Sequence, residues 1–200
     1  FQNARLNIIG PTRISDLFSL RNQHTLRQLL SAIQTIQSPE IRELLELCFS
    51  AALPQASRLI PVIRRRKGKV HHAQIGSWSH GYWKPTEHFE IYPWRCFNTR
   101  VRRMAAALRE INILLPDVAP TEMFSLLEQR EGYALEKGDA VEMLSTMPDQ
   151  SVDYVLCDPP HGDRIPYLEM SQLWNSWLNE CPRWDQEIVI SDAIDRGKTE

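Results

Sequence analysis

The chain has 200 residues, of which 42% are hydrophobic, and a formal net charge of −2. This composition provides for one core, or one core with a small appendage, and excludes a disordered chain; we also expect no membrane-spanning segment. The charge is unevenly distributed. Residues 58–103 contain 11 Lys or Arg against 2 Asp or Glu, whereas residues 104–200 contain 7 against 19. The basic middle segment is therefore suited to binding phosphates, and the acidic end is not, except at a small site.

Cysteine usage favours a reducing, cytoplasmic environment. Cys48, Cys96, Cys157 and Cys181 are widely spaced and form no C-x-x-C pair, which argues against a zinc site or a disulfide framework. The histidines of the middle segment have no regular metal-ligand spacing, so we predict no metal site. The chain begins at Phe1 without a signal-peptide pattern, and we expect it to be part of a longer or processed polypeptide.

Residues 12–60 have the pattern of a helical hairpin. Ser15 or Thr12 is expected to cap the first helix, and Ser38 with Pro39 at the first helical position begins a second helix that lasts until Pro54. Apolar residues recur at three- and four-residue spacing along the first helix and are expected to form its buried stripe. They are Leu17, Leu20, Leu26, Leu29, Leu30, Ile33 and Ile36, with Phe18 beside them.

Residues 61–93 are expected to be irregular. The run Arg64-Arg65-Arg66-Lys67-Gly68-Lys69 is followed by many aromatic residues, among them Trp78, Tyr82, Trp83 and Tyr92. Basic residues interleaved with aromatic ones can bind a nucleic-acid strand by charge and stacking. The alternative is a solvated charged turn beside aromatic residues that fill a core.

The rest of the chain predicts an α/β unit after a long helix. The long helix covers 93–115 and ends before Pro116; a short helix over 121–128 follows. A strand over 133–137, the pair Gly138-Asp139, a helix through Met143 and a strand over 152–156 come next. We therefore divide the chain into a mainly helical region, 1–115, with the basic and aromatic segment 58–103, and an α/β region, 116–200.

The second strand leads into Asp158-Pro159-Pro160-His161. Two consecutive prolines fix two φ angles and remove two backbone donors, and Pro159 favours an extended conformation for Asp158. The carboxylate is then held rigidly at the C-terminal edge of a sheet, where open α/β sheets bind ligands. This arrangement is suited to orienting an amino group before it reacts.

Asp158-Pro159-Pro160-His161 resembles the Asp-Pro-Pro-aromatic motif of amino-methyltransferases, which methylate exocyclic nitrogens of nucleobases with S-adenosylmethionine. Residues 135–144 and 147–153 resemble the segments before that motif in the DNA enzymes, and residues 165–178 resemble the helix after it in an adenine-specific branch. The resemblance implies a fragment of an adenine-N6 (or cytosine-N4) DNA methyltransferase, with a partial Rossmann-like sheet, S-adenosylmethionine as the cofactor and DNA as the partner.

The resemblance also implies roles for individual residues. Asp158 and the Pro159 carbonyl would accept hydrogen bonds from the base amine, Pro160 completes the motif, and His161 stands where the family stacks an aromatic ring on the flipped base. Tyr167 is a second candidate for stacking. Gly138 and Asp139 would contact the cofactor, and the basic run would bind the substrate backbone through Arg64, Arg65, Arg66, Lys67 and Lys69.

The glycine-rich cofactor loop of these enzymes has no counterpart here, because none of the 8 glycines forms a G-x-G pair. We therefore expect the loop in the rest of the parent polypeptide, and we expect this fragment alone to be inactive. Three other interpretations remain open: an RNA guanine-N2 methyltransferase, since Gly162 also fits that group; a non-catalytic nucleic-acid-binding module with a degenerate motif; and a structural α/β domain.

Overall fold

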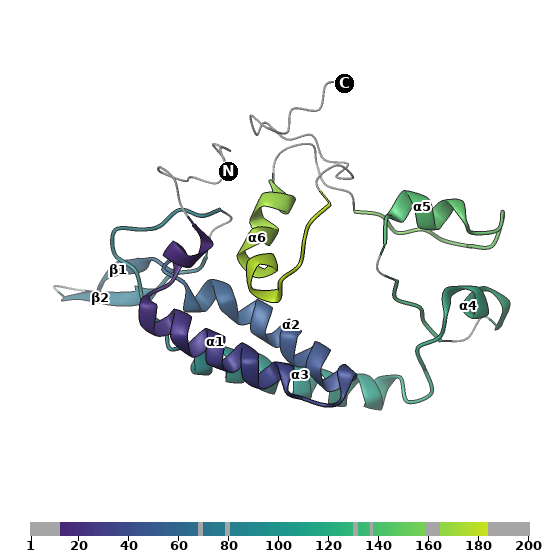
Figure 1. Ribbon diagram of the computed structural model, residues 1–200, viewed down its shortest axis with the longest axis horizontal. Helices are drawn as coiled ribbons and strands as arrows, with labels where there is room; N and C mark the ends of the chain where they lie inside the picture. The colour runs from purple at the N-terminus through teal and green to yellow at the C-terminus, as the bar shows by residue number, and fades with distance from the viewer. Residues whose placement is uncertain are drawn as a thin grey trace, which may run out of the picture. The chain divides into compact units, whose positions relative to one another are not determined.

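The computed structural model describes residues 13–67, 70–78, 81–129, 132–136, 138–158 and 165–183. In these ranges the protein is mainly helical, with one small antiparallel sheet (Figure 1). The elements are η2 (Ile14–Leu17), α1 (Leu20–Gln34), α2 (Pro39–Ala56), β1 (Val62–Lys67), β2 (Val70–Ile75), α3 (Pro93–Leu114), α4 (Met123–Gln129), α5 (Ala140–Ser145) and α6 (Tyr167–Leu178). The chain divides into two units, residues 1–105 with 160–200, and residues 106–159. None of the described helices is both long enough and apolar enough to cross a bilayer.

The predicted helical hairpin is confirmed: α1 and α2 pack side by side in the first unit (Figure 1). Ser38 caps α2 by accepting a hydrogen bond from the Ile41 amide at 3.3 Å, and Pro39 opens the helix as expected. Pro54 lies in the last turn of α2, which continues to Ala56 rather than ending at the proline.

The predicted start of the first helix is wrong. Its N-cap is Ser19, whose hydroxyl accepts from the Asn22 amide at 3.2 Å; Ser15 belongs to the separate turn η2, and Thr12 lies outside the described residues. The chain between η2 and α1 is extended at Phe18, which interrupts the helical period. Leu20 is consequently 82% exposed instead of joining the buried stripe, whereas Leu17, Phe18, Leu26, Leu30 and Ile33 are buried.

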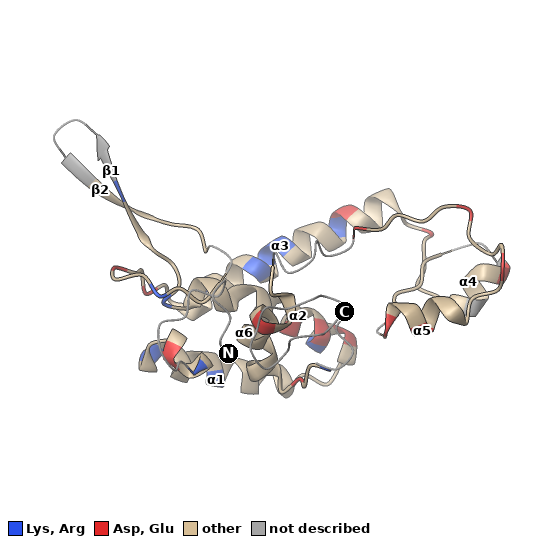
Figure 2. Ribbon diagram, turned by 90° about the horizontal axis from the view of Figure 1, so that it is seen from above, with Lys and Arg blue, Asp and Glu red and all other residues tan. Residues whose placement is uncertain are grey.

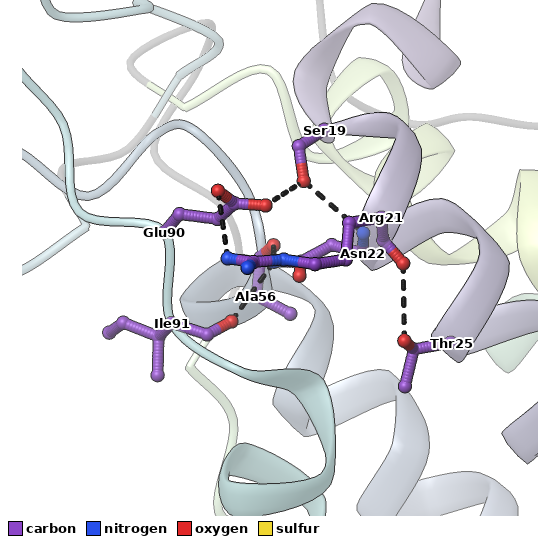
Figure 3. Close-up of polar contacts among 7 residues, drawn as sticks. All are labelled: Ser19, Arg21, Asn22, Thr25, Ala56, Glu90 and Ile91. Atoms are coloured by element: carbon purple, nitrogen blue, oxygen red, sulfur yellow. Dashed lines mark hydrogen bonds and ion pairs between the residues drawn. The ribbon is translucent and has the colours of Figure 1, made fainter.

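A polar cluster joins the beginning of α1 to two distant segments (Figure 3). The Asn22 side chain donates to the carbonyl of Ala56, at 2.9 Å, and to that of Ile91, at 3.0 Å. Beside it, Glu90 accepts a hydrogen bond from the Ser19 hydroxyl and forms an ion pair of 3.0 Å with Arg21. Asn22 is almost fully buried. This one amide therefore connects α1 to the end of α2 and to the segment before α3.

Helix α6 completes the core of the first unit. Met170 and Leu173 are buried, and the Trp177 ring meets the rings of Phe18 and Phe49 edge-on, at centroid distances of 5.4 and 5.9 Å. The helix that follows the Asp-Pro-Pro motif in sequence thus packs with residues from the first 60 of the chain.

The expectation of an irregular segment over 61–93 is wrong for its first part. β1 and β2 form an antiparallel hairpin whose register runs from Val62 opposite Ile75 to Lys67 opposite Val70. Apolar β-branched residues in both strands favour this pairing. The hairpin is fixed at its base, where the Gly76 amide donates to the Pro61 carbonyl at 2.9 Å, and it leads away from the helices (Figure 2).

The second unit has no buried side chain among its described residues. The strands expected at 133–137 and 152–156 are not formed in the described residues; residue 137 lies outside them, and Tyr133 makes only an isolated parallel bridge with Pro120. Parallel strands need hydrogen-bonding neighbours and cover on both faces, and the described chain supplies neither. Leu135 and Leu156 are accordingly 91% and 85% exposed. The partial Rossmann-like sheet is therefore absent from the described residues.

Candidate functional site

Asp158 is the one residue of the Asp-Pro-Pro-His motif that the structure describes, and its side chain is exposed. Pro159, Pro160 and His161 lie outside the described residues. The segment that leads to Asp158 is irregular from Ser151 onwards, and Tyr154, Val155 and Leu156 are largely exposed. The carboxylate is therefore accessible to a ligand, with apolar side chains immediately before it.

The Gly138-Asp139 pair forms the entry to α5. One oxygen of the Asp139 carboxylate, Oδ1, accepts hydrogen bonds from the amides of Val141, at 2.8 Å, and Glu142, at 3.1 Å, so Asp139 is the N-cap of the helix. A Cβ atom on residue 138 would lie 2.8 Å from the Met143 sulfur, so glycine leaves room for that side chain. The predicted order of a Gly-Asp pair followed by a helix is confirmed. The cofactor contact of Gly138 and Asp139 stays a prediction.

Tyr167 is the first residue of α6 and is 48% exposed. Two residues later, Glu169 is fully buried, so the first turn of the helix has one exposed and one buried side. An exposed ring at this position is available for stacking on a planar ligand.

Tyr82 anchors α6 from the segment after the hairpin. Its hydroxyl lies 2.6 and 2.7 Å from the carbonyls of Glu169 and Met170 and accepts a hydrogen bond from the Leu173 amide at 3.1 Å. Burial raises the pKa of Tyr82, because the phenolate would lose its hydration. We grouped this ring with the aromatic residues that could bind nucleic acid; since it is only 3% exposed, it cannot stack on a base.

Sequence reasoning missed the role of Tyr82 because its partners lie almost 90 positions further along the chain. The aromatic residues of this region divide into two sets. Tyr82 is buried and Trp78 is partly buried against the core, whereas Trp83, Tyr92 and Trp94 are exposed. The exposed set alone can contact a ligand.

The basic run lies in β1. The Arg64 guanidinium makes a two-pronged contact with Glu87, from Nε at 3.0 Å and from Nη2 at 3.1 Å. That contact lowers the pKa of Glu87 and raises that of Arg64. Arg64 is thus neutralised at the base of the hairpin. Arg65, Arg66 and Lys67 continue β1 away from that pair, with Arg65 opposite His72 and Arg66 opposite His71; Lys69 lies outside the described residues.

Within the described ranges, no three His, Cys, Asp or Glu side chains are grouped so as to hold a metal ion. Comparisons of the chain with protein-family models, with curated proteins and with solved structures gave no match. A function can therefore be inferred only from the residues themselves.

Proposed function

We propose that the chain contains the base-binding part of an S-adenosylmethionine-dependent amino-methyltransferase that acts on DNA, with adenine N6 as the preferred target. The observation that carries the proposal is Asp158-Pro159-Pro160-His161 in its sequence context. The local order supports it: a Gly-Asp pair, helix α5, an apolar segment, an exposed Asp158 and then helix α6.

The chemistry requires orientation rather than a strong base. The lone pair of an exocyclic base nitrogen is delocalised into the ring, so the nitrogen is a poor nucleophile. The Asp158 carboxylate accepts one N–H and the Pro159 carbonyl accepts the other, which directs the lone pair towards the methyl donor. Because a duplex hides the amine, the base must flip out; His161 or the exposed ring of Tyr167 then stacks on it.

The apolar residues before Asp158 fit the proposed sheet. A parallel strand buried on both faces is an almost continuous apolar run, and residues 152–156 have that character while lying exposed. Further strands, with the glycine-rich cofactor loop, come from the rest of the polypeptide. Asp139 is suited to the cofactor because its two cap bonds go to one carboxylate oxygen, Oδ1. S-adenosylmethionine supplies the methyl group when bound.

The hairpin is suited to binding the DNA. The major groove of B-DNA admits a two-stranded β-ribbon, and β1 supplies consecutive basic residues to such a ribbon. Arg65, Arg66, Lys67 and Lys69 are the residues that we assign to phosphate contacts. Arg64 is already paired with Glu87.

One observation favours a second candidate, a non-catalytic nucleic-acid-binding module. In the described part of the chain the basic hairpin is formed, whereas the sheet of the methyltransferase is not. The RNA guanine-N2 reaction uses the same base-binding chemistry and differs in the polymer that is bound.

Transfer of a labelled methyl group from S-adenosylmethionine separates these candidates. The full-length polypeptide is incubated with duplex DNA or with RNA, and the product is digested to nucleosides. Label in N6-methyladenine or N4-methylcytosine supports the proposal, and label in N2-methylguanosine of RNA supports the alternative reaction. Nucleic-acid binding without transfer to either polymer would overturn the enzymatic proposal in favour of the binding module.

A further inference from the structure

Helix α3 has a buried face and an arginine-rich face. Pro93, Cys96 and Phe97 are buried, and Val101 and Met104 pack against the same core. Four of the five arginines of the helix are exposed. Figure 2 shows Lys and Arg positions in blue along α3. These four are Arg95, Arg102, Arg103 and Arg109.

The spacing of these arginines follows the helix axis. Arg95 and Arg102 are seven positions apart, and both lie in the part of α3 that belongs to the first unit. Seven positions are nearly two turns, so the two side chains lie on one line, about 10 Å apart at 1.5 Å per residue. Phe97 and Met104 lie on the opposite side of the helix. We call Arg95 and Arg102 the arginine stripe of α3.

The stripe is not balanced by acidic residues. The helix carries five arginines and one acidic residue, Glu110. Arg21 and Arg64 each form an ion pair with a glutamate, but no carboxylate in the described part of the chain forms one with the stripe. Solvated helix faces usually mix charges of both signs, so a line of arginines without acidic neighbours calls for an anionic partner.

We propose that the arginine stripe of α3 binds the phosphodiester backbone of duplex DNA. Guanidinium groups are suited to this because their fixed N–H pairs match two phosphate oxygens, and a straight row can contact successive phosphates. The contact is independent of base sequence and is separate from the hairpin and from Asp158. It rests on the proposed function only in that the substrate is a nucleic acid.

Fluorescence anisotropy with a labelled 20-base-pair duplex at increasing salt tests this proposal. The chain is compared with the variant Arg95→Gln/Arg102→Gln and with the control Arg13→Gln/Arg27→Gln, which removes two exposed arginines outside α3. Each phosphate contact contributes roughly 0.9 to the slope of log K against log salt, so the α3 variant should lower the slope by about 1.8. The control variant should have the same slope as the unsubstituted chain. Circular dichroism establishes that all three proteins have the same helix content.

Equal salt slopes for the unsubstituted chain and the α3 variant would overturn the proposal. An equal decrease of the slope in the control variant would also overturn it. Binding to vesicles of anionic lipid without binding to the duplex would assign the stripe to a membrane surface instead. Methyl transfer by the full-length polypeptide, measured beside the salt slope, separates this proposal from the proposed function, because a phosphate contact of α3 does not require transfer. If the α3 variant lowers the slope but the full-length polypeptide has no transfer activity, DNA binding by the arginine stripe is supported and the methyltransferase proposal is contradicted.

Discussion

Replacing Tyr82 by phenylalanine should loosen α6, the helix that follows the Asp-Pro-Pro motif. The substitution removes only the hydroxyl, which lies between the carbonyls of Glu169 and Met170 and the amide of Leu173. The phenylalanine ring still fills the space. The substitution removes one donated and one accepted hydrogen bond at a buried site, at about 1 kcal/mol each, so it should cost about 2 kcal/mol. For a chain of this size each kcal/mol lowers the melting temperature by roughly 2–4 °C, so we expect a decrease of about 6 °C.

Thermal unfolding followed by circular dichroism gives the melting temperature, and tryptophan fluorescence reports on α6 through Trp177, which packs against Phe18 and Phe49. Tyr92→Phe is the matched control, because that ring is 55% exposed and a surface substitution should change stability by less than about 0.5 kcal/mol. If Tyr82→Phe has the same melting temperature as Tyr92→Phe and the unsubstituted chain, the Tyr82 hydroxyl does not anchor α6.

The same residue predicts a dependence on alkaline pH. Burial raises the pKa of Tyr82 in the folded chain, whereas an unfolded tyrosine ionises near pH 10. Above that pH, unfolding of the chain releases a proton from Tyr82. The contribution of the neutral Tyr82 to the stability of the folded chain is therefore complete below pH 10 and is lost as the pH rises. The parent chain should therefore lose stability between about pH 10 and 11 more steeply than Tyr82→Phe.

Three further predictions concern the frame of the first unit. Asn22→Ala should lower the free energy of unfolding in urea by about 2–4 kcal/mol, because it leaves one buried and one partly buried carbonyl without their donor. The hydrogen bond from Ser19, with the ion pair to Arg21, lowers the pKa of Glu90 in the folded chain. The stability that Glu90 contributes is therefore present above the ordinary pKa of 4.5 and is lost as the pH falls below it. The urea concentration at the unfolding midpoint should consequently fall less between about pH 6 and 3 in Glu90→Gln than in the unsubstituted chain. Gly76→Ala should lower the melting temperature more than Gly138→Ala, because the new methyl would lie 2.7 Å from the Pro61 ring in the first case and beside a movable methionine sulfur in the second.

Local patterns predicted the helices well. The Ser38-Pro39 start of α2, the apolar period of α1 and the end of α3 before Pro116 are properties of neighbouring residues, and the structure has all three helices. The start of α1 was misplaced because Ser15 and Ser19 are both good caps, and only the packing of Phe18 and Leu17 decides between them.

Two features of the structure were not predicted, the hairpin and the burial of Tyr82. The hairpin was missed because the four consecutive basic residues were interpreted as a loop, although β-branched residues that favour strand pairing lie beside them. The available signal was the pair of runs at 62–67 and 70–75, on either side of Gly68. Tyr82 was missed because its burial depends on α6. The strands at 133–137 and 152–156 were predicted from apolar runs, but a strand also needs neighbours, which the sequence of one strand does not reveal.

The rate of methyl transfer to DNA by the full-length polypeptide, with Asp158→Asn beside Asp117→Asn, tests the central claim most directly. Both carboxylates are exposed, and both substitutions remove one charge. If Asp158 orients the base amine, Asp158→Asn should slow transfer on the order of 100-fold or more, while Asp117→Asn should leave it nearly unchanged. Equal rates in the two variants would contradict the claim that Asp158 binds the base.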